Sequence, residues 1–68
     1  MNIEEAFKQR AEARLELFNL SGANGASYDI DYLVSLERRK TQALIKIGQA
    51  EKFINDYIEK EVASVQNF

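Results

Sequence analysis

The sequence predicts an all-α protein, an antiparallel helical hairpin with a short first helix and a long second helix. Proline is absent from the 68 residues, so no residue is barred from a helix interior. Two of the three glycines lie in the one stretch with turn composition, residues 21–27. On both sides of that stretch, apolar residues recur every three or four positions, as in amphipathic helices. We therefore expect one domain, residues 1–68, with a helix over about 3–20, a loop over 21–27 and a helix over about 29–64.

The first helix carries an apolar stripe that predicts the face packed against the second helix. The stripe consists of Ile3, Phe7, Ala11, Leu15 and Phe18, widened on one side by Ala6, Ala13, Leu17 and Leu20. Glu4 and Glu5 lie in the first turn, where acidic side chains complement the helix dipole. We expect Gly22 to end the helix as the C′ residue in a left-handed conformation.

The second helix is predicted to begin at Ser27 or Asp29, either of which can cap the first turn. With Asp29 as the cap, Tyr28 and Leu33 have the spacing of a hydrophobic staple. A heptad pattern typical of coiled coils follows. It is formed by Leu33, Leu36, Ala43, Ile47, Ala50, Ile54 and Tyr57, is broken at Lys40, and is continued by Ile58, Val62 and Val65.

Gly48 raises the alternative of a break that would give three helices. A glycine in a helix interior costs only about 1 kcal/mol relative to alanine, so it does not decide the matter alone. The pattern from Ala43 to Ile54 keeps its phase across Gly48. We therefore expect one continuous second helix.

The two predicted helices differ in length, which indicates a partner. At 1.5 Å per residue the first is about 27 Å long and the second about 54 Å. The first helix would then cover only residues near 30–47, and the exposed remainder would need a second copy or another helical protein. The predicted partner interface comprises Ile47, Ala50, Phe53, Ile54, Tyr57, Ile58, Val62 and Val65.

The composition argues against an enzyme. Without cysteine or histidine, thiol chemistry, thiolate zinc sites and the commonest general base are excluded. Asp29 and Asp31 resemble the start of a calcium loop, but Val34 stands where that loop requires glycine. The stretch 21–27 lacks the Gly-Lys-Ser/Thr ending of a phosphate loop, and Glu12 and Glu16 lie on the polar face. We predict no catalytic, cofactor-binding or metal-binding residue.

Basic residues are expected to form a belt near the middle of the antiparallel hairpin, where Arg10 and Arg14 should lie level with residues 36–40. Glu37 is the main acidic residue near this belt. The members of the belt are Arg10, Arg14, Arg38, Arg39 and Lys40. The belt could bind phosphate, nucleic acid or an acidic partner. The favoured interpretation is structural, with side chains that pair internally or with another subunit. Ile30, Val34 and Ile45 leave open a second contact surface opposite the main stripe.

These features favour a non-enzymatic protein–protein interaction or assembly subunit. By analogy at the level of fold, such hairpins occur as small structural components of virions or secretion machines and as co-chaperones. The alternative is a nucleic-acid-associated regulator that uses the basic belt, although the net charge of −2 makes nucleic acid a poor partner. No apolar run is long enough to cross a membrane, and the acidic N-terminus is unlike a signal peptide. The expected location is the cytoplasm or an assembled particle.

Overall fold

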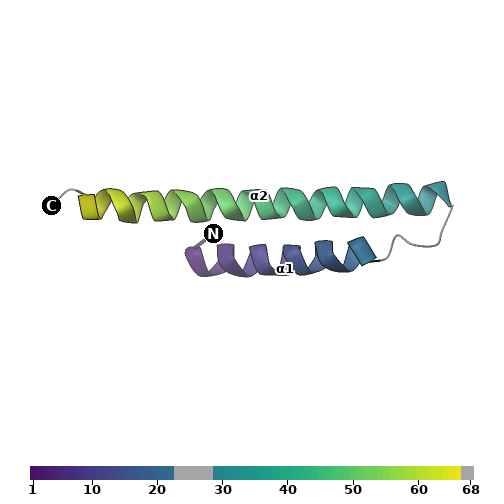
Figure 1. Ribbon diagram of the computed structural model, residues 1–68, viewed down its shortest axis with the longest axis horizontal. Helices are drawn as coiled ribbons and strands as arrows, with labels where there is room; N and C mark the ends of the chain where they lie inside the picture. The colour runs from purple at the N-terminus through teal and green to yellow at the C-terminus, as the bar shows by residue number, and fades with distance from the viewer. Residues whose placement is uncertain (23–28, 67–68) are drawn as a thin grey trace.

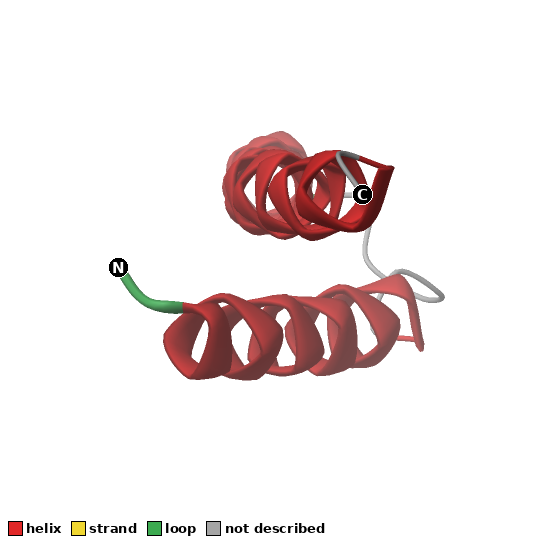
Figure 2. Ribbon diagram, turned by 90° about the vertical axis from the view of Figure 1, so that its left-hand side faces the viewer, coloured by secondary structure: helices red, strands yellow, loops and turns green. Residues whose placement is uncertain are grey.

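The computed structural model describes residues 1–22 and 29–66, and all its regular structure in those residues is helical. Helix α1 spans Ile3–Gly22 and helix α2 spans Ile30–Gln66. The two helices lie side by side and run in opposite directions (Figure 1). Seen along the long axis, they form a single pair in which α1 is inclined to α2 (Figure 2). The predicted all-α hairpin with unequal arms is confirmed.

The molecule is a thin rod. Its principal extents are 60 × 17 × 14 Å and its radius of gyration is 16.7 Å. A compact chain of this length would have a radius of gyration of about 11 Å. Helix α2 extends beyond α1 at both ends, and further at its C-terminal end (Figure 1). Most side chains of the rod therefore have solvent on at least one side.

Both helices begin with a side-chain cap. Asn2 Oδ1 accepts a hydrogen bond from the Glu5 backbone N–H at 2.8 Å, which supplies a partner for one of the free amides of the first turn of α1. Asp29 Oδ1 accepts a hydrogen bond from the Asp31 N–H at 3.0 Å and caps α2. The prediction of Asp29 as a cap is confirmed, whereas Ser27 and Tyr28 lie outside the described residues.

The expected end of the first helix is wrong. Gly22 is the last residue of α1 and is not left-handed, since no described glycine has a positive φ. Ser21 Oγ donates to the Leu17 carbonyl oxygen at 2.8 Å, so one carbonyl of the last turn finds a side-chain partner. The helix can therefore continue through Gly22 without a Schellman turn.

Helix α2 passes through Gly48 without interruption, which confirms one continuous helix. Gly48 is exposed, and a Cβ atom built on it would meet no atom within 4 Å. Neither backbone conformation nor intrachain packing therefore requires a glycine at this position.

The packed face of α2 follows the predicted heptad pattern, but that of α1 differs from the prediction. The residues that α1 turns towards α2 are Ile3, Ala6, Arg10, Ala13, Leu17 and Leu20, all buried or half-buried. Ala6, Ala13, Ala43 and Ala50 are each no more than 2% exposed. Small residues at these facing positions let two helices approach closely. Phe7, Leu15 and Phe18, which the prediction placed at the centre of the contact, are exposed because alanines occupy it instead.

Candidate functional site

The predicted partner interface lies partly inside the hairpin. Ala50 is fully buried and Ile54 is 3% exposed, so both are covered within the chain. The prediction assumed that the second helix starts level with the end of the first. In the structure α2 begins beyond the end of α1, and α1 is displaced towards the middle of α2 (Figure 1). The expectation that Ile54 has no intrachain partner is therefore wrong.

The other predicted interface residues are more accessible. Ile47 and Phe53 are half-buried, whereas Tyr57, Ile58 and Val62 are exposed. The side chain of Val65 lies outside the described part of the structure. The exposed portion of the predicted interface is thus the last few turns of α2.

The predicted basic belt is divided in two. Arg14 Nη2 lies 2.9 Å from Glu51 Oε1. Glu51 follows Lys40 by eleven residues, or about 16 Å along the helix. Arg10 places its guanidinium carbon 5.1 Å from the centroid of the Phe7 ring, a cation–π contact. The expectation that both α1 arginines lie level with residues 36–40 is wrong.

The α2 half of the belt makes different contacts. Lys40 Nζ lies 3.4 Å from Glu37 Oε1, and the Lys40 side chain is only 16% exposed. Its methylene stem thus fills the position that interrupts the heptad pattern while its ammonium group reaches the surface. Arg38 and Arg39 are exposed and make no ion pair with another described residue. Of these three basic residues, Lys40 is the one that the structure pairs with Glu37.

The ion pair between Arg14 and Glu51 lies on one flank of the hairpin, and exposed apolar residues surround it. On α1, Phe7 and Phe18 lie within about 40° of Arg14 around the helix axis. On α2, Leu44 and Ile58 are seven residues before and after Glu51, two helical turns away on the same side. We define the apolar flank as Phe7, Phe18, Leu44, Ile58 and Val62, each of which is between 46% and 74% exposed.

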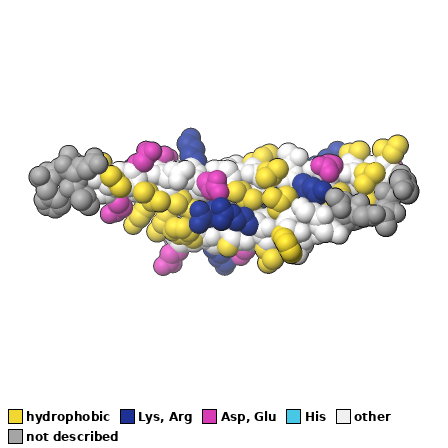
Figure 3. Space-filling view, in the orientation of Figure 1, with side chains coloured by type: hydrophobic (Ala, Val, Ile, Leu, Met, Phe, Trp, Pro, Cys, Tyr) yellow, Lys and Arg dark blue, Asp and Glu magenta, His cyan; other side chains and the backbone are white. Residues whose placement is uncertain are grey.

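Figure 3 shows this face of the rod. Hydrophobic side chains run along it over both helices, interrupted near the middle by basic and acidic side chains. Sequence patterning alone could not separate this flank from the packed face, because both lie within one broad apolar sector of α1.

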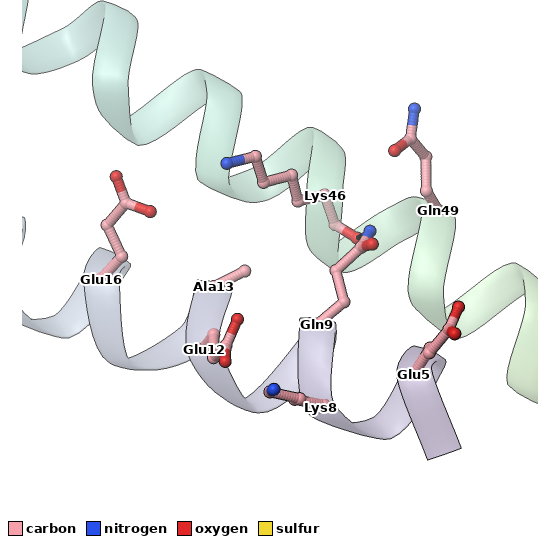
Figure 4. Close-up of a pocket in the computed structure, with 8 residues that line it drawn as sticks. All are labelled: Glu5, Lys8, Gln9, Glu12, Ala13, Glu16, Lys46 and Gln49. Atoms are coloured by element: carbon pink, nitrogen blue, oxygen red, sulfur yellow. Dashed lines mark hydrogen bonds between the residues drawn. The ribbon is translucent and has the colours of Figure 1, made fainter. Parts of the chain in front are cut away.

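The opposite flank is polar. Gln9 Nε2 donates a hydrogen bond to the Lys46 carbonyl oxygen at 3.2 Å, which ties the helices together on this side. An open groove of about 420 Å³ runs beside this contact, with charged side chains along its edges (Figure 4). It is lined by Glu5, Lys8, Gln9, Glu12, Ala13, Glu16, Lys46 and Gln49. Its acidic and basic side chains are all exposed, as on an ordinary solvated surface.

The described residues contain no cluster of three or more acidic, histidine or cysteine side chains able to hold a metal ion. Within the same residues, no helix is both long and apolar enough to cross a membrane. No protein-family model, curated protein or solved structure matches this chain. The apolar flank is therefore the candidate functional site on physical grounds alone.

Proposed function

We propose that the protein is a non-enzymatic interaction or assembly subunit that docks through its apolar flank. Such a subunit would serve as a small structural component of a larger particle or machine, or as a co-chaperone. The observation that carries the proposal is the exposure of large apolar side chains beside a core built mainly of alanine. Phe18 is 74% exposed, while Ala6 and Ala50 are fully buried.

Energetics support the same proposal. Burying a large apolar side chain contributes about 1.5–3 kcal/mol, whereas an alanine offers one methyl group. In the hairpin the larger residues Phe7, Phe18 and Ile58 are left in water. Two helices that keep their largest apolar residues exposed gain stability by covering them with a further helical surface.

The nucleic-acid alternative has less support. Arg14 is paired with Glu51, Lys40 is paired with Glu37, and the two pairs lie apart along α2. Nucleic-acid affinity depends on several unpaired cations that reach neighbouring phosphates together. Only Arg38 and Arg39 remain as adjacent, exposed arginines without an ion pair among the described residues.

The proposal is tested by measuring molecular mass with light scattering after size exclusion, over a series of protein concentrations. We expect mass to rise with concentration and to fall back to that of one chain in the variants Phe18→Asp and Ile58→Asp. A charge placed on an apolar contact loses solvation without gaining a partner. Circular dichroism should show the helicity of the wild type in both variants, because neither residue is buried in the hairpin.

The control is Leu15→Asp, since Leu15 is exposed and apolar but lies on the outer face of α1, away from Arg14 and the apolar flank. It should associate as the wild type does. A chain that is monomeric at every concentration, yet helical and no less stable in the two flank variants, would contradict the proposal.

A further inference from the structure

The exposed side of α2 carries a second heptad pattern, about a quarter turn from the face that packs on α1. We call it the outer seam. At its centre lie Leu44 and Gly48, one turn apart and both exposed. The members of the outer seam follow one another at alternating steps of four and three residues, as in a coiled coil. They are Ile30, Val34, Glu37, Thr41, Leu44, Gly48, Glu51, Asn55, Ile58 and Val62.

Gly48 is the unexplained residue of this seam. A glycine inside a helix costs about 1 kcal/mol relative to alanine. Gly48 has no positive φ, and nothing within 4 Å of its missing Cβ would oppose a side chain. A glycine on one helix leaves room for a large side chain of another helix to pack over it.

We propose that this side chain is Leu44 of a second copy, and that two α2 helices pair antiparallel through their outer seams; the inference rests on the proposed interaction function. A two-fold axis near residue 46 sets Leu44 of each chain against Gly48 of the other. The contact then has two equivalent layers, and in each of them a leucine of one chain packs over the glycine of the other without a steric clash.

The same two-fold axis also places seam residues of like polarity opposite one another. Towards the ends of the contact, Val34 lies opposite Ile58 and Ile30 lies opposite Val62, so apolar residues meet apolar residues. All four side chains are about half exposed or more in the hairpin and are free to be covered. By the two-fold symmetry each pair occurs at both ends of the dimer, and removing its apolar surface from water stabilises the association.

The polar members of the seam also meet one another. Glu37 lies opposite Asn55, whose amide can donate to the carboxylate, and Thr41 lies opposite Glu51. Moving the helices by one heptad in either direction would set apolar residues against polar ones. A parallel pair in register would face Glu37 with Glu37, Glu51 with Glu51 and Gly48 with Gly48, combining like charges with a void.

The positions of the two α1 helices are compatible with this dimer. An antiparallel two-fold axis perpendicular to the α2 pair leaves both α1 helices on the same side of that pair. Phe7 and Phe18 lie beside Arg14, which pairs with the seam residue Glu51, so they are on the same side of the hairpin as the seam. In the dimer they therefore face the other hairpin. The assembly is a four-helix bundle that covers the apolar flank.

The test is an exchange of the two central residues. Gly48→Leu alone sets leucine against leucine in both central layers, and Leu44→Gly alone leaves both layers empty. Each single variant should raise the dissociation constant of the dimer about tenfold or more, measured by analytical ultracentrifugation. The double variant Leu44→Gly with Gly48→Leu rebuilds the same layer in reverse, and its dissociation constant should return to within about threefold of the wild type.

The control Gln49→Leu adds a leucine on the polar flank and should leave association unchanged. Orientation is checked by introducing Val34→Cys and Ile58→Cys into one chain. The two positions are about 36 Å apart on a single helix, so a disulfide between them must join two copies. The Val34→Cys variant alone should form no cross-linked dimer.

Three results would overturn the inference. The first is a monomeric wild type, and the second is a double variant that is as weak as the two single effects added together. The third is rapid cross-linking of the Val34→Cys variant alone, which indicates parallel helices. If association is lost in Phe18→Asp and Ile58→Asp but the exchange restores nothing, the outer seam is wrong while the proposed function stands.

Discussion

Alanine decides how the two helices meet. Ala6 and Ala13 on α1, like Ala43 and Ala50 on α2, are spaced by seven residues and are almost completely buried. A methyl group at such a position fills the space between two close helices, and a larger side chain would have to push them apart.

Ala13→Leu should therefore lower the free energy of unfolding by about 1–3 kcal/mol, because the added atoms have no room at the contact. The measurement is urea unfolding followed by circular dichroism, in solutions dilute enough to keep every variant monomeric. Ala11→Leu is the matched control, since Ala11 is exposed on the same helix. If the two substitutions have equal effects, Ala13 is not at a close contact.

Lys40 is the charged residue of the packed face of α2. Its side chain is 16% exposed and its ammonium group reaches Glu37 at 3.4 Å. Lys40→Met keeps the length of the stem and removes the charge, so it should raise the free energy of unfolding by up to about 1 kcal/mol. Lys52→Met, at an exposed position, should change it by less than about 0.5 kcal/mol. A destabilised Lys40→Met variant would show that the ion pair matters more than the burial.

At the scale of the element, α2 is a helix of 37 residues with one glycine in its interior. Gly48→Ala should stabilise the monomeric hairpin by up to about 1 kcal/mol, because the helix gains a better helix former and nothing stands in the way of the Cβ. Thermal unfolding at low protein concentration measures the change. A loss of more than about 1 kcal/mol would mean that Gly48 forms a bend in solution.

Two isoleucines one turn apart on α2 should respond differently to the same change. Ile54 is 3% exposed and Ile58 is 50% exposed. Ile54→Asp should destabilise the monomeric hairpin by several kcal/mol, because a carboxylate would be buried without a partner. Ile58→Asp should leave the monomer within about 0.5 kcal/mol of the wild type. Amide exchange along α2 at low concentration distinguishes the two, and equal protection in both variants would contradict the observed burial.

The sequence predicted the elements better than their mutual position. The heptad pattern located the packed face of α2 correctly from Leu33 to Ile54, because apolar residues occupy most of its steps there. The face of α1 was misjudged because Phe7 and Phe18 outweigh Ala6 and Ala13 on any hydrophobicity scale, although close packing favours the smaller residues. The register was misjudged because residues 21–29 carry no periodic pattern that fixes how far α2 begins beyond α1.

At the scale of the whole molecule, the alanine contact between α1 and α2 has a thermodynamic consequence. The heat capacity change of unfolding reports the apolar surface that becomes hydrated, and an average globular chain of this length shows about 0.9 kcal/mol/K. A rod 60 Å long and 14 Å thick whose core is mostly methyl groups hides little such surface as a monomer. Calorimetry should therefore give a smaller value, a shallow denaturant slope and a broad melting curve. Association would add apolar burial, so the melting curve should sharpen as the protein concentration rises.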